Sequence, residues 1–227
     1  MIKMAVNIYP ISLGVTQCYL IQDKGAILID VGAPKKIKHF IKCIERLGIK
    51  PNDIKLIIPT HGHLDHIGSA KDIKEITGAR IAMHHIEKEW LEKAQKHIPP
   101  AVTLWGHIIS KTLGFLLPLI HFPASKVDII LGDENFSLIE FGIPGKVIYT
   151  PGHSPGSVSV LLETGDAFVG DLAMNSFPLR LSPGLPIFAD DIKEVKNSLK
   201  LLLDKGATTI YPAHGQSFSA ERIRTFL

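Results

Sequence analysis

Short apolar runs recur along the whole chain, and most of them stop at Gly, Pro, Asp or His. Runs of this length that are rich in Ile, Val and Leu are typical of buried strands. Helical spacing of apolar residues appears between them, as in PKKIKHFIKCIERLG, where Ile37, Phe40 and Ile44 share one face. Such a chain favours mixed sheets with helices on their outer faces. The predicted strands cover residues 5–9, 16–21, 26–31, 55–59, 80–83, 128–131, 136–141, 146–150, 157–162, 167–170 and 208–211, and the predicted helices lie within 34–48, 69–78, 190–206 and 219–227.

Size and charge are those of one ordinary globular domain. The chain has 227 residues, of which 45% are hydrophobic and 21% are charged, so it can bury a sizeable core. We therefore treat residues 1–227 as a single domain. The net charge is +3, and no run of Lys or Arg resembles a nucleic-acid footprint. We expect a small-molecule substrate and no nucleic-acid partner.

The cysteines and the N-terminal residues bear on cellular location. Cys18 and Cys43 are the two cysteines, both in apolar contexts, and they do not suggest a disulfide framework. Asn7 and Pro10 interrupt the apolar core that a signal peptide requires. Both observations favour a reducing compartment, and we predict a cytoplasmic protein.

Residues 85–126 are rich in aromatic residues and helix formers, and we predict a helical insertion there. Its part 101–122 is nearly as long as a membrane span, which needs about 20 apolar residues. His107, Lys111 and His121 make insertion costly, so we expect no stable membrane span. A lid over a pocket, a homodimer contact and a membrane-surface contact all remain open. The side chains available for a lid are Trp90, Trp105, Leu113, Phe115, Leu116, Leu117 and Phe122.

The stretch IIPTHGHLDHIGS places His61, His63, Asp65 and His66 at the end of a predicted strand. On an extended segment, residues two apart point the same way, so His61 and His63 could grip one ion. Asp65 and His66 follow where the chain turns towards a helix, and their side chains can face a second ion nearby. Imidazole and carboxylate suit zinc and similar metals.

Three later predicted strands also end at a metal-binding residue type: His153 in YTPGHSPGS, Asp171 in AFVGDLAM and His214 in IYPAHGQ. A single loop histidine is usually a surface or hydrogen-bonded residue. We interpret the six other histidines in that way, namely His39, His84, His85, His97, His107 and His121. Four strand ends that each carry His or Asp are improbable by chance, because active sites form from loops at one end of a sheet. The joint pattern predicts a metal site.

THGHLDH, followed in order by His153, Asp171 and His214, resembles the metallo-β-lactamase superfamily. The resemblance extends from ILIDVG to YPAHG and leaves out the predicted insertion. It implies an α+β fold, a four-layer αβ/βα sandwich of two mixed β-sheets flanked by helices. It also implies a centre for two divalent metal ions, with zinc expected and iron or manganese as alternatives.

The resemblance also implies a role for each matching residue. His61, His63 and His153 would bind the first metal, Asp65, His66 and His214 the second, and Asp171 would bridge both. Asp30 of ILIDVG would orient the histidine loop from behind the ligands. A hydroxide between the two metals would attack the substrate. Asp65 would be catalytic, orienting this nucleophile or relaying its proton.

Differences between this sequence and individual branches of the family reduce the number of reactions that we expect. Gly62 and Leu64 stand where the iron redox branch has a Glu within the motif, and no Cys follows Asp171 as in one major antibiotic-degrading subgroup. The pattern is closest to glyoxalase II-like hydrolases and lactonases, without the helical C-terminal domain of glyoxalase II. We therefore predict a hydrolase of a small ester, thioester or lactone. The alternatives are a mononuclear iron sulfur oxygenase, a phosphodiesterase and a β-lactamase.

Two polar residues after Asp171 are candidates for substrate contact. Asn175 and Arg180, in MNSFPLRLSPG, could meet a polar or anionic group of the substrate. Arg180 could equally serve as a structural ion-pair partner. The segment YPISLG, between the first two predicted strands, could fold over the site as a flap.

Overall fold

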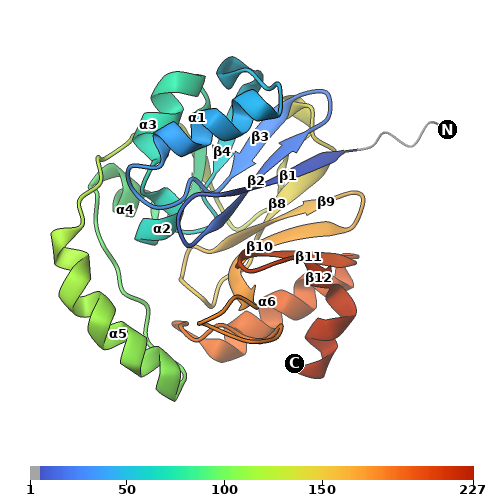
Figure 1. The fold of residues 1–227 in the computed structure, drawn as a ribbon. Coiled ribbons are helices and arrows are strands. Elements are labelled where there is room, and N and C mark those ends of the chain that lie inside the picture. Colours follow the sequence, from blue (N-terminus) through green and yellow to red (C-terminus); the bar gives the residue numbers. More distant parts are fainter. Residues whose placement is uncertain (1–5) are drawn as a thin grey trace.

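The computed structural model describes residues 6–227, which build two six-stranded sheets (Figure 1). In the first sheet, the order is β1 (Asn7–Ser12), β2 (Gln17–Gln22), β3 (Ala26–Ile29), β4 (Ile54–Ile58), β5 (Arg80–His84) and β6 (Ile129–Leu131). Strands β1 to β3 pair antiparallel, and β3 to β6 pair parallel. This sheet is therefore mixed.

The second sheet runs in the order β12 (Phe218–Ser219), β11 (Thr209–His214), β10 (Asp166–Met174), β9 (Val158–Leu162), β8 (Gly145–Tyr149) and β7 (Phe136–Ser137). Only the pair β10–β11 in this sheet is parallel among the described strands. The two sheets pack face to face, because one buried cluster takes Ile27 and Leu56 from the first sheet and Val160 and Phe168 from the second.

Helices cover the outer face of each sheet, which gives the four layers visible in Figure 1. Helices α1 (Ile37–Arg46) and α3 (Ala70–Thr77) bury Phe40, Ile44 and Ile73 against the first sheet. Helix α6 (Ile192–Asp204) and the 3-10 helix η4 (Ala220–Thr225) share a cluster with Val169 of the second sheet. The predicted αβ/βα sandwich is confirmed.

Side-chain alternation explains why β3 reads as a continuous apolar run. Ala26 and Leu28 lie in the cluster under α1, whereas Ile27 and Ile29 lie in the cluster between the sheets. Successive side chains of a strand point to opposite faces, so a strand covered on both faces must be apolar throughout. The Ile-rich runs of the sequence follow from this double burial.

Several predicted boundaries are wrong. Residues 136–141 form only the short strand β7, followed by the 3-10 helix η3 (Ile139–Phe141), and β12 was not predicted. Strand β10 continues through Asp171, which therefore lies inside a strand rather than after one. Most of the predicted flap belongs to β1, so the turn is only 13–16. Ala5, part of the first predicted strand, lies outside the described residues.

Residues 85–126 belong to the connection between the parallel neighbours β5 and β6. Helix α4 (Lys88–Glu92) packs inward, and Leu91 and Phe122 join the core under the first sheet. Helix α5 (Leu104–Leu116), continued by the 3-10 helix η2 (Leu117–Leu119), stands off the side of the sandwich (Figure 1). Two further short helices are η1 (Pro51–Asp53) and α2 (Leu64–Ile67). Among residues 6–227, no helix combines the length and apolarity needed to cross a membrane.

Candidate metal centre

All seven predicted ligand residues meet at one edge of the two sheets. His61 and His63 follow β4, and Asp65 and His66 belong to the short helix α2. From the second sheet, His153 comes from the β8–β9 connection, Asp171 from β10 and His214 from the last position of β11. The parallel strands β3 and β4 of one sheet and β10 and β11 of the other thus bring their carboxyl ends together.

The side chains fall into three groups whose donor atoms lie within 4.8 Å of one another. These groups are His61, His63 and His153; Asp65, His66 and His214; and His61, His66 and Asp171. The first two are the sets that the resemblance implies, and the third places Asp171 between them. The structure brings the residues together, while their role as ligands stays a prediction.

Separations between donor atoms suit a tetrahedral metal. Nε2 of His153 lies 3.1 Å from Nδ1 of His63, and Nε2 of His214 lies 3.2 Å from Oδ2 of Asp65 and 3.3 Å from Oδ2 of Asp171. Zinc–ligand bonds near 2.05 Å require neighbouring donors about 3.3 Å apart in a tetrahedron. Nε2 of His61, Nε2 of His66 and Oδ1 of Asp171 are buried with no hydrogen-bond partner. Buried polar atoms without partners destabilise a fold, and bound metal ions would provide partners for these three atoms.

Backbone carbonyl groups fix the orientation of two of the histidines, His153 and His214. Nδ1 of His153 faces the carbonyl oxygen of Phe188 at 2.9 Å, and Nδ1 of His214 faces that of Val15 at 3.1 Å. A carbonyl oxygen can only accept a hydrogen bond, so Nδ1 must carry the proton and donate in both rings. This tautomer leaves Nε2 as the free lone pair, as metal binding requires.

Asp30 lies directly behind the histidine loop and is 1% exposed. Its Oδ1 accepts a hydrogen bond from the backbone N–H of Thr60 at 2.8 Å, and its Oδ2 lies 3.1 Å from Nδ1 of His66. Asp30 adopts a φ of 59°, an uncommon conformation for a residue other than glycine. The carboxylate therefore connects the end of β3 to His66 and to the start of the loop.

Burial and charge divide the histidines into two kinds. Burial lowers the pKa of His61, His63 and His153, so these rings are neutral without any metal. Burial also opposes charging of His66, but Asp30 and the other nearby carboxylates raise its pKa to about 9. The pKa of His214 is raised despite its burial, chiefly by Asp171. Protons on His66 and His214 thus offset part of the negative charge of Asp30, Asp65 and Asp171 when cations are absent.

The chain matches the family model of the metallo-β-lactamase superfamily over residues 11–214. It belongs to this superfamily. The match covers the first sheet from β1, the histidine loop and the second sheet as far as His214. The prediction from the HxHxDH motif is therefore confirmed at the level of the family.

Three relatives are 26% to 31% identical to the chain over the parts that align. A probable metallo-hydrolase, YqgX of Bacillus subtilis, is 31% identical over 68% of this chain and 64% of its own length. The hydroxyacylglutathione hydrolase GloC of Haemophilus influenzae is 27% identical over 77% of each chain. An N-acyl homoserine lactonase of Bacillus cereus is 26% identical over 65% of this chain and 58% of its own.

The solved structures agree on the fold. An archaeal metallo-β-lactamase superfamily protein from Sulfolobus tokodaii superposes with a TM-score of 0.70, at 22% identity, over 97% of this chain and 84% of its own. A B3 metallo-β-lactamase, BLEG-1, gives a TM-score of 0.69 at 22% identity over 95% of both chains. At this identity the likeness concerns the fold alone.

Glu87 is a buried residue beside the candidate centre that the sequence analysis did not predict. It is 0% exposed, and it accepts hydrogen bonds from the backbone N–H of Gly62 at 2.6 Å and of Gly156 at 2.7 Å. Gly62 separates His61 from His63, and Gly156 follows His153. One carboxylate therefore connects the two loops that supply the first group of histidines. In the sequence Glu87 is one of three Glu in IEKEWLE, and no local signal distinguishes it.

Trp90 closes the side of the centre next to His63. Its ring stacks on His63 with centroids 6.0 Å apart and on His97 at 3.7 Å. A Cβ at position 62 would lie 2.6 Å from the Trp90 ring, which explains the glycine between the two histidines. Part of the predicted insertion thus contacts the centre, as a lid would.

The two candidate substrate residues are occupied by backbone partners. The side-chain amide of Asn175 accepts from the N–H of Gln216 at 2.8 Å and donates to its carbonyl oxygen at 3.0 Å. Nη1 of Arg180 donates to the carbonyl oxygen of Leu185 at 2.8 Å within its own loop. Asn175 therefore holds the segment after His214, and substrate contact by either residue stays a prediction.

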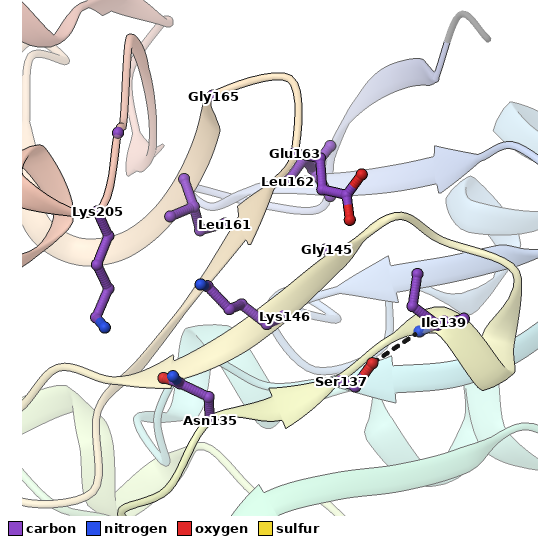
Figure 2. A pocket seen from close by; sticks show the side chains of 11 residues that line it. Asn135, Ser137, Ile139, Gly145, Lys146, Leu161, Leu162, Glu163, Gly165 and Lys205 are labelled. Carbon is purple, nitrogen blue, oxygen red and sulfur yellow. Dashed lines mark hydrogen bonds between the residues drawn. The ribbon is translucent and has the colours of Figure 1, made fainter.

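The cavity drawn in Figure 2, of about 520 Å³, is separate from this centre. Lys146, Glu163 and Lys205 are among the residues that line it. It lies at the start of β8 and the end of β9, whereas His153 lies in the connection at the opposite end of these two strands. A further group, His84, His85 and Asp133, is mostly exposed and shares no residue with the seven.

Proposed function

We propose that the chain is a dinuclear metallo-hydrolase that cleaves a small ester, thioester or lactone. The family and its relatives confirm the coarser statement, a metal-dependent hydrolase. One observation supports the more specific proposal of a dinuclear centre. Two complete groups of three donor residues are present, and Asp171 lies beside both. A mononuclear site would need only one of these groups.

The donor set fits two divalent ions. His61, His63 and His153 would hold one ion and Asp65, His66 and His214 the other, with Asp171 between them. When bound, the ions would supply the positive charge that lowers the pKa of a water molecule and polarises the substrate. Zinc suits these nitrogen and oxygen donors, with iron or manganese as alternatives.

Asp65 is the member of the centre best placed to act on substrate. Its side chain is 31% exposed, compared with 9% for Asp171 and 6% or less for His66 and His214. The hydroxyl of Thr16 donates to Oδ2 of Asp65 at 3.0 Å, which fixes the rotamer of the carboxylate. The exposed carboxylate can accept a proton from attacking water and deliver it to the leaving group.

The surroundings favour a substrate with a carbonyl and an apolar portion. Trp90 provides an aromatic wall beside His63, and apolar walls with a few polar groups are typical of small-molecule sites. Two relatives carry names that support this class, a hydroxyacylglutathione hydrolase and an N-acyl homoserine lactonase. Both names denote substrates in which an acyl carbon is attacked.

Metal quantification together with a hydrolysis screen tests the proposal. The screen should contain thioesters, lactones, β-lactams and phosphodiesters, and the variants are Asp65→Ala and His66→Ala. The matched control is His39→Ala, which removes an exposed histidine of α1. We expect two ions per chain and hydrolysis in the wild type and control, and loss of at least one ion and of hydrolysis in both variants. Unchanged metal content and activity in the variants would refute the assignment, and one iron per chain with oxygen uptake would replace it by the sulfur oxygenase.

A further inference from the structure

Large apolar side chains are exposed along α5, η2 and the loop after β10. Leu104, Ile108 and Phe115 of α5 are 87%, 58% and 78% exposed, and their spacing places them on one face of the helix. Leu119 of η2 is 70% exposed, and Phe177 and Leu181 of the loop are 80% and 88% exposed. We call these six side chains the α5 surface. Large exposed apolar side chains that gather on one part of a protein mark a binding surface more often than side chains that are scattered singly.

The two segments that carry the α5 surface are connected to each other. Nε1 of Trp105 donates to the carbonyl oxygen of Pro178 at 2.9 Å, and Ala101 pairs with Phe188 in an isolated bridge. Gly106 is the only buried residue of α5. Ile109 in the second turn packs against the small buried cluster of Met174, Ile187 and Phe188. The helix therefore contacts the protein along its first two turns, and its later part stands off the sandwich, as Figure 1 shows.

The charge of the same segments is positive without exception. Lys111 is the only charged residue of α5 and η2, and Arg180 is the only one of residues 172–189. The wider stretch 93–127 has three further Lys and no Asp or Glu, although Lys93 pairs with Glu89 just before it. Lys111 is exposed and lies between Ile108 and Phe115, next to the apolar face. The whole chain has 22 acidic residues, so a stretch of this length without one sets the region apart.

We propose that the α5 surface binds an anionic lipid membrane surface. Apolar side chains beside cations are the combination by which a helix lies in the headgroup region, with its apolar face inserted and its cations next to phosphates. Helix α5 is too short to span a bilayer and can lie in its plane. A second copy of the chain fits less well, because a symmetric contact would bring like charges together with no carboxylate between them.

Vesicle co-sedimentation of the full chain tests this proposal. The vesicles are phosphatidylcholine alone and phosphatidylcholine with phosphatidylglycerol, at low and high salt. We expect binding to the anionic vesicles that weakens with salt, and little binding to the neutral ones. The double variant L104S/F115S should reduce the partition coefficient by about tenfold or more, given the usual contribution of a buried apolar side chain. Lys111→Glu should also weaken binding.

Ile130→Ser is the matched control, because Ile130 is 61% exposed but lies on β6. It should leave vesicle binding unchanged. Far-ultraviolet circular dichroism verifies that each variant is folded. Absence of binding to anionic vesicles, or equal binding to both kinds, would overturn the proposal. So would a stable dimer by sedimentation velocity that L104S/F115S dissociates, since a second copy would then cover the surface. These measurements do not depend on catalysis, so their outcome is independent of whether the proposed function is correct.

Discussion

Replacing Glu87 by Gln should loosen the metal centre without touching a ligand. Each carboxylate oxygen of Glu87 accepts one backbone N–H, at 2.6 Å from Gly62 and 2.7 Å from Gly156. Gln has the same shape but only one accepting oxygen, so its NH₂ group must face one of these N–H groups. The backbone of one of the two loops then loses its buried partner.

The magnitude follows from these two contacts. A hydrogen bond to a charged group contributes about 1.5–3 kcal/mol, and a buried donor left without a partner costs about 1–3 kcal/mol. The two figures overlap, so we expect Glu87→Gln to lower the free energy of unfolding by about 2–4 kcal/mol. Burial raises the pKa of Glu87, and the Ser154 side chain and the N–H groups of Gly156 and Gly62 counteract this. The cost of burying the carboxylate therefore reduces the net stabilisation that its hydrogen bonds give. Metal affinity should fall by about 10- to 100-fold, as for other residues that orient ligands.

Two measurements separate the stability effect from the effect on the centre. Urea unfolding followed by circular dichroism, with chelator present, gives the stability of the metal-free protein. Competition with a chelating dye gives the metal affinity. The control is Glu89→Gln, two residues further on in α4, which should change neither quantity. The carboxylate of Glu89 pairs with Lys93 at the surface. If Glu87→Gln matched the control in both assays, the proposed connection between the loops would be wrong.

Three further results are expected. Asp30→Asn should weaken metal binding by about 10-fold or more, measured by the same competition, because it removes the carboxylate that orients His66; wild-type affinity would contradict this role. Metal affinity should rise between pH 6 and 9 with release of protons, measured by calorimetry in buffers of different ionisation enthalpy, because the raised pKa values of His66 and His214 mean that cations displace protons there; a flat profile would count against it. Trp90→Ala should raise KM for substrates with apolar acyl groups more than for short ones, because the aromatic wall beside His63 is lost; equal effects on both would show that Trp90 only supports the fold.

Much of the fold could be predicted from the sequence because its signals are local. Buried strands such as β3, β4 and β9 must be apolar on both faces, so they appear as short Ile- and Val-rich runs. Asp191 caps the N-terminus of helix α6, because its side chain accepts hydrogen bonds from the N–H groups of Lys193 and Glu194, and the sequence predicted this cap. The exceptions, such as residues 136–141, are short apolar runs in which strand and 3-10 helix share the same composition.

The sequence by itself determined which residue types could bind metal and in what order they occur. Each of the seven stands at or near the end of an apolar run, and the carboxyl ends of strands meet at sheet edges. The resemblance to the family implied how the donors are grouped, and only the tertiary structure decided which ring nitrogen stays free and that Asp171 lies within β10. It also revealed Glu87, which contacts Gly62 and Gly156 far from it in sequence, and the exposure of α5. Parts of the chain that are distant in sequence decide which group a side chain hydrogen-bonds to and which face of a helix is exposed. The local sequence therefore does not predict either of them.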